Sequence, residues 1–176
     1  MNIVEREWRE FSNIAKPANF PARDLFVIKC FYVRGFTECS RAFELMVKNK
    51  WPYNELIHQL ITWFDELVEI IQDSNSNDSV NVESLQTSLT PLEGLFKRLT
   101  EEMTCDESTI FELKRALITG FQHCICHIGN DGLEDIPIEK TINNLLIDSE
   151  TLMNLLMEKQ AKGEFILDDA TNSKIH

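Results

Sequence analysis

The chain has 176 residues, 43% hydrophobic and 26% charged, and its 29 acidic and 17 basic side chains give a net charge of −12. Such an acidic chain is a poor candidate for direct contact with nucleic acid, because neutralising phosphates requires lysine and arginine. No stretch approaches the roughly 20 apolar residues of a membrane span, and the first residues are too charged for a signal peptide. We therefore expect an intracellular globular domain that binds neither nucleic acid nor membrane directly.

The first predicted helix covers residues 3–15, and Pro17 and Pro21 separate it from the next apolar segment. Residues 22–34 are then apolar on nearly all sides, which favours a buried helix. A helix without a polar face must be covered all round. It is expected to form either the centre of the domain or half of a subunit interface.

Gly35 is predicted to end this second helix, and Thr37 to cap a third over residues 38–49. Trp51 and Pro52 end that helix. A long helix is expected over 54–72, and its predicted buried face consists of Leu56, Ile57, Leu60, Ile61, Phe64, Leu67, Val68 and Ile71.

A polar loop is predicted over residues 73–88, because its run of Asp, Ser and Asn cannot bury enough apolar area to offset the entropy of ordering. Directly after it, Thr90 and Glu93 form a capping box around Pro91, which is favoured at the first helical position. This strong start signal predicts a helix to about residue 104.

Three further helices are expected in the last part of the chain. A turn at Gly129–Gly132 follows the first of them, Pro137 opens the second and Asp148 caps the third. Their predicted ranges are 108–128, 137–146 and 148–162. The sequence thus predicts an all-α fold in a single domain, residues 1–163, with about eight helices and a flexible tail over residues 164–176.

The densest cluster of chemically active side chains is His123-Cys124-Ile125-Cys126-His127. His123 and His127 share one helical face, but the two cysteines point elsewhere, and a structural zinc needs four convergent ligands. We interpret the segment as a packed helix end and predict no metal site. The six glycines form no phosphate-binding loop and no nucleophile signature is present, so the sequence predicts no cofactor and no enzymatic activity. The five cysteines are expected to be reduced thiols.

The order of these segments and one motif resemble the dimerisation domain of the telomere repeat-binding factors, the TRF homology (TRFH) domain. The motif is Leu89-Thr-Pro-Leu-Glu93, which stands after a long polar loop and before a helix pair. Phe31 to Met46 is similar to the hairpin that ends the family's first long helix, and Leu67 to Ile70 resembles the end of the helix that enters the loop. Ile125 to Asn130 resembles a later helix end. The similarity spans roughly residues 25–160.

The resemblance implies an all-α homodimer of eight or nine helices that binds short F/Y-x-L-x-P-type peptides. It implies a non-enzymatic role in a shelterin-like, telomere- or chromosome-associated complex in the nucleus. The implied peptide-binding residues are Leu67, Ile70, Ile71, Val82, Leu85, Leu89, Thr90, Pro91, Leu92 and Glu93. The implied dimer interface is Phe26, Val27, Cys30, Phe31, Val33, Leu152, Leu155 and Leu156.

Several features depart from the family, among them an additional N-terminal helix over residues 3–15. The loop between Asp73 and Leu89 has no aromatic residue, and Glu69 stands at a basic position. The alternative hypothesis rests on charge: an acidic helical adaptor or inhibitor, for example of viral or phage origin and then cytoplasmic, that binds a basic target protein.

Overall fold

The computed structural model describes residues 2–15, 21–76, 92, 95–101, 103–134 and 136–165, without the side chains of 14–15 and 69–76. Within these ranges the fold is all-α, as predicted, and has six helices. They are α1 (Ile3–Ala15), α2 (Ala22–Lys48), α3 (Tyr53–Ser76), α4 (Leu95–Thr100), α5 (Glu107–Leu133) and α6 (Ile138–Ala161). None of these helices is long and apolar enough to cross a membrane.

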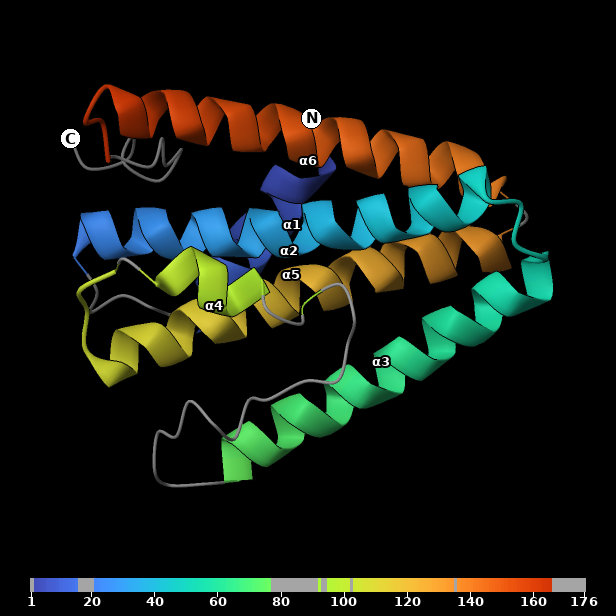
Figure 1. Cartoon of the computed structure of the whole chain (residues 1–176), viewed down its shortest axis with the longest axis horizontal. Helices are drawn as coiled ribbons and strands as arrows, with labels where there is room; N and C mark the ends of the chain where they lie inside the picture. The colour runs from blue at the N-terminus through green and yellow to red at the C-terminus, as the bar shows by residue number, and fades with distance from the viewer. Residues whose placement is uncertain are drawn as a thin grey trace.

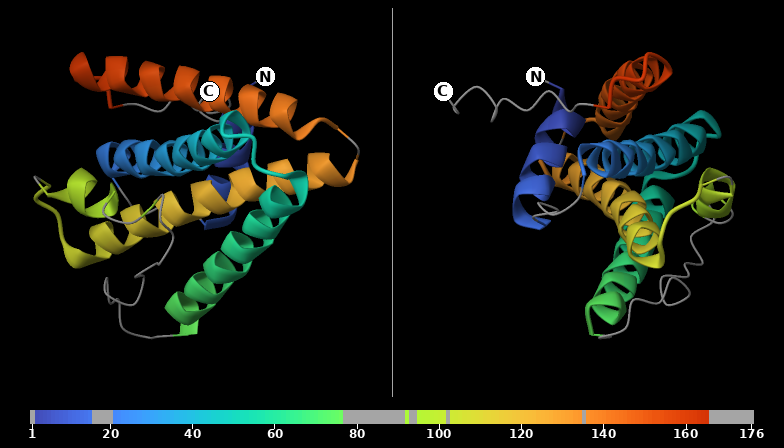
Figure 2. Two further views of the ribbon diagram at one scale, coloured as in Figure 1. Left: turned by 45° about the vertical axis from the view of Figure 1, so that its right-hand side comes forward. Right: turned by 90° about the vertical axis from the view of Figure 1, so that its left-hand side faces the viewer.

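Three long helices, α6, α2 and α5, lie one above another with α2 in the middle (Figure 1). The short α1 crosses behind α2 and α5. Helix α3 starts near the C-terminal end of α2 and diverges from the three long helices (Figure 2). The apolar segment 22–34 is therefore the centre of the domain. Phe26 and Tyr32 of this segment are fully buried, as is Phe36 just after it on the same helix.

The predicted helix end at Gly35 is wrong, because α2 runs without interruption through it. A Cβ atom at Gly35 would lie 2.0 Å from the carbonyl oxygen of Leu117 in α5, so the glycine serves close helix packing. Buried side chains continue beyond it, with Thr37, Cys39 and Phe43 on the same helix. Packing along both halves outweighs the roughly 1 kcal/mol that a glycine costs inside a helix.

The predicted helix break near Asp148 and the turn at Gly129–Gly132 are also wrong. Helix α6 continues through Ser149, which is fully buried and donates its hydroxyl hydrogen bond to the carbonyl of Leu146. Helix α5 continues to Leu133, and the chain turns only before Pro137. Removing the two expected breaks, at Gly35 and before Asp148, reduces the eight expected helices to six in the described ranges.

The corner between α2 and α3 confirms the predicted break at Trp51 and Pro52. Lys50 has a positive φ of 56°, the left-handed conformation that commonly follows a helix. The amide of Trp51 then donates to the carbonyl of Met46, 3.1 Å away, and closes the end of α2. Helix α3 extends to Ser76, so residues 73–76 of the predicted polar loop are helical.

Candidate functional site

Helix α3 carries two apolar stripes side by side. The inner stripe, Leu56, Leu60, Trp63 and Leu67, is buried in the core. The outer stripe is Ile57, Ile61, Phe64 and Val68, at the same helical spacing. Ile61 is 55% exposed and Phe64 37%, whereas Ile57 and Val68 at its two ends are half-buried.

The outer stripe corrects one sequence prediction. The sequence predicts Ile61 and Phe64 on the buried face of this helix, whereas the structure leaves both exposed. The sequence signal for this exposure is the width of the apolar arc on the helix. Eight apolar side chains within residues 56–68 cover more of a helix than one neighbouring helix can bury, so one edge of the arc must face outward.

Two of the ten predicted peptide-binding residues have described side chains. Leu67 is fully buried in the inner stripe and Leu92 is also buried, so both contribute to the core. Ile70 and Ile71 lie in α3, but their side chains are outside the description. The remaining six, Val82, Leu85, Leu89, Thr90, Pro91 and Glu93, lie outside the described residues, as does the predicted capping box.

Most of the predicted dimer residues are buried within the single chain. Phe26, Phe31, Val33, Leu152 and Leu156 belong to the core, where α2 faces α5 and α6. Val27 and Cys30 are half-buried. Leu155, at 48%, is the exposed member of the set, on the outer face of α6.

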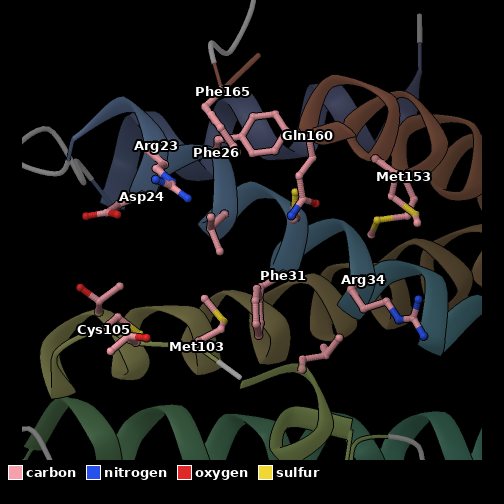
Figure 3. A pocket seen from close by; sticks show the side chains of 16 residues that line it. Arg23, Asp24, Phe26, Phe31, Arg34, Met103, Cys105, Met153, Gln160 and Phe165 are labelled. Atoms are coloured by element: carbon pink, nitrogen blue, oxygen red, sulfur yellow. The ribbon is translucent and has the colours of Figure 1, made fainter. Parts of the chain in front are cut away.

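A cavity of about 790 Å³ opens between the first half of α2, the end of α6 and the segment that joins α4 to α5 (Figure 3). Its middle is apolar and rich in sulfur. The residues along these walls are Phe26, Val27, Cys30, Phe31, Leu99, Met103, Cys105, Met153 and Met157. Phe165, just after α6, packs its ring edge-on against Phe26 at 5.6 Å between centroids.

Two arginines of α2 stand at opposite ends of this cavity, and their surroundings differ (Figure 3). Arg34 forms an ion pair with Glu38, at 2.9 Å between Nε and Oε1. The guanidinium of Arg23 instead lies over the Phe165 ring, 4.8 Å from its centroid. No carboxylate among the described residues pairs with Arg23.

The histidines of the cysteine–histidine cluster both have partners in the helices packed against α5. Nδ1 of His123 lies 2.6 Å from the Tyr32 hydroxyl, and Nε2 of His127 lies 3.1 Å from a carboxylate oxygen of Glu7 in α1. Burial lowers the pKa of His123, and it raises the pKa of Tyr32, so their contact joins two neutral groups. The described residues contain no group of three or more potential metal ligands.

All five cysteines are free thiols. Cys39 of α2 and Cys124 of α5 are fully buried, and Cys124 lies 3.3 Å from the Ser40 hydroxyl. Burial raises the pKa of Cys39 well above its ordinary value and that of Cys30 to about 12. A thiol with so high a pKa is a poor nucleophile, because the thiolate is the reactive form.

No family model, curated protein or solved structure matches this chain at a significant level. The outer stripe of α3, the exposed Leu155 of α6 and the cavity beside α2 are surfaces open to a partner or a ligand.

Proposed function

We propose that this chain is a non-enzymatic interaction domain that binds a short apolar segment of a partner protein along the outer face of α3. The observation that carries the proposal is the exposure of Ile61 and Phe64 in the middle of a regular apolar stripe. Neighbouring apolar side chains on an exposed helix face mark interaction sites more often than isolated ones do. Burying them against a partner contributes about 25 cal/mol per Å² before the cost of association.

The resemblance to the TRFH family supports the same part of the chain, because that family binds its peptides at the corresponding helix and loop. Carried over, the partner is a telomere- or chromosome-associated protein in the nucleus, and its peptide is of the F/Y-x-L-x-P type. The stripe at Ile57, Ile61, Phe64 and Val68 would extend the binding surface toward the start of α3.

The test uses fluorescein-labelled Phe-x-Leu-x-Pro peptides in which x is degenerate, with anisotropy as the signal. A glutamate at position 61 would place a charge in the proposed interface, so Ile61→Glu should weaken binding about tenfold or more. Ile147→Glu on α6 is the matched control, because Ile147 is 54% exposed. Equal binding by the two variants, or no binding by the wild-type chain, would contradict the proposal.

The homodimer is a second part of the proposal, with Leu155 at its centre because this predicted interface residue has the exposed side chain. We expect the wild-type chain to sediment as a dimer and Leu155→Glu as a monomer with an unchanged circular dichroism spectrum. A wild-type chain that sediments as a monomer at high concentration would remove the dimer from the proposal and leave the peptide site standing.

A further inference from the structure

The cavity beside α2 has the dimensions of a ligand site. Its volume of about 790 Å³ falls within the range of roughly 300–1,000 Å³ that is usual for small-molecule pockets. Its walls come from α2, α6, Phe165 and the segment before α5, so it exists only in the folded chain (Figure 3). It does not include the outer stripe of α3.

The middle of the cavity is mainly apolar, although the amide of Gln160 also reaches it from α6 (Figure 3). Phe31, Met153 and Leu99 face it from α2, α6 and α4, and the backbone groups within α2 and α6 bond inside their own helices. One side-chain amide cannot satisfy an extended peptide, so most of the peptide's backbone amides would be buried unpaired there, at a cost of about 1–3 kcal/mol each. A hydrocarbon chain carries no such groups. Methionine side chains also adapt their shape readily to flexible apolar ligands.

The mouth at the start of α2 provides the opposite chemistry. Arg23 presents a guanidinium that no described carboxylate neutralises, although the chain as a whole carries a net charge of −12. The Phe165 ring holds this guanidinium in place through a cation–π contact. Asp24 lies at the same mouth, but its carboxylate points away from the middle of the cavity in Figure 3. A planar guanidinium held this way can bind a carboxylate through two hydrogen bonds.

We propose that this cavity binds a free long-chain fatty acid, with the carboxylate on Arg23 and the hydrocarbon chain along Phe26, Phe31 and Met153. The length of the cavity agrees with this ligand. Arg23 and Arg34 are eleven residues apart on α2, which corresponds to about 16 Å along the helix axis. Arg34 at the far end is paired with Glu38, so Arg23 is the arginine available to the anion.

The methionines provide a direct readout. Met103, Met153 and Met157 line the cavity, whereas Met46 is buried near the other end of α2. The full chain is labelled with ¹³C at the methionine methyl groups and titrated with sodium dodecanoate below its micellar concentration. The methyl signals of the three cavity methionines should shift and saturate, while that of Met46 stays in place.

Two comparisons separate the ion pair at Arg23 from the contacts of the hydrocarbon chain: a ligand without the carboxylate and a variant without the guanidinium. Dodecanol has the same hydrocarbon chain without the carboxylate, and it should bind about tenfold or more weakly. Arg23→Gln should weaken dodecanoate binding to the level of dodecanol. Arg6→Gln in α1 removes the same charge outside the cavity lining and should bind dodecanoate like the wild-type chain. Met157→Trp, at an exposed position of the wall, should narrow the cavity and weaken both ligands.

Failure of any of these readouts would overturn the proposal. Cavity methionines that do not shift would show that no chain enters, and equal shifts at Met46 would show general detergent-like binding. Unchanged affinity of Arg23→Gln for dodecanoate would show that Arg23 does not bind the carboxylate. Co-sedimentation with phosphatidylserine vesicles, without any response to dodecanoate, would assign the surface to a lipid headgroup in a membrane instead of a free fatty acid.

Discussion

Gly35 and Gly120 bring α2 and α5 into backbone contact. A Cβ atom at Gly35 would lie 2.0 Å from the carbonyl oxygen of Leu117, and a Cβ at Gly120 would lie 2.0 Å from that of Tyr32. Each glycine thus faces the backbone of the opposite helix. Because both obstructing atoms are main-chain atoms, they cannot move aside as a flexible side chain can.

Alanine at either position should therefore force the central helices apart. We expect Gly35→Ala and Gly120→Ala each to lower the free energy of unfolding by about 3 kcal/mol or more. Urea denaturation followed by circular dichroism measures the loss. Gly129→Ala is the matched control on α5, because a Cβ there meets nothing within 4 Å. That variant should stabilise the chain by about 0.5–1 kcal/mol, and destabilisation by it would contradict this account of the helix.

A buried ion pair attaches α1 to α2. Nζ of Lys29 lies 2.7 Å from a carboxylate oxygen of Glu5, and the lysine side chain is only 7% exposed. Glu5→Gln removes the partner and leaves a buried cation, so we expect a loss of about 3–5 kcal/mol in unfolding free energy. Arg9 pairs with the same carboxylate from the surface, and Arg9→Gln should cost less than about 1 kcal/mol. Equal losses in the two variants would show that the buried pair is not the stronger attachment.

The histidine beside Tyr32 should make stability depend on pH. Burial lowers the pKa of His123 in the folded chain below its ordinary value of 6.5, and the nearby carboxylates of Glu7 and Glu10 oppose only part of this effect. The unfolded chain then binds the proton more readily than the folded chain, so this part of the stability is present above pH 6.5. It is lost as the pH falls from 6.5 to the folded pKa.

Urea unfolding at a series of pH values between about 7.5 and 5 measures this loss. His123→Gln should lose less stability on acidification than the wild-type chain does. His58→Gln, at an exposed histidine of α3, should keep the wild-type profile. Parallel profiles for wild type and His123→Gln would rule out this origin of the pH dependence.

The thiols should differ sharply in reactivity. Cys30 has a pKa raised to about 12 by burial, and Cys39 and Cys124 are fully buried. Brief treatment of the native chain with iodoacetamide at about pH 8 should therefore leave these three unmodified and label Cys105 first, because its side chain is the least buried of the thiols whose pKa is raised. Peptide mass spectrometry locates the label. If Cys30 were modified as fast as Cys105, the burial of the Cys30 thiol in α2 would be contradicted.

The sequence predicted the helical class and the chain breaks at Pro21 and Pro52, because proline limits a helix through its own geometry. The prediction at Gly35 is wrong for a physical reason. A glycine that ends a helix and one that admits a neighbouring helix look alike in sequence, and only the packing partner distinguishes them. The partner that explains Gly35 is the backbone of Leu117, which lies 82 positions further along the chain.

The candidate surfaces were predictable to different degrees. The apolar arc of α3 is visible in the sequence, but which edge of it faces outward depends on where α5 lies. The cavity was not predictable, because Phe31, Met103 and Met153 come from three separate segments. Arg23 has no sequence signal that distinguishes it from the other arginines until Phe165 is placed beside it.

Asp148 is predicted to begin a helix, but it lies inside α6 and caps the start of α1 instead. Its carboxylate accepts a hydrogen bond from the amide of Ile3 at 2.8 Å, and its carbonyl accepts another from the side chain of Asn2. The start of α1 is therefore secured by a residue 145 positions later. During synthesis α1 leaves the ribosome long before Asp148 is made, so the first turn of α1 gains this cap only once α6 has been made and packed.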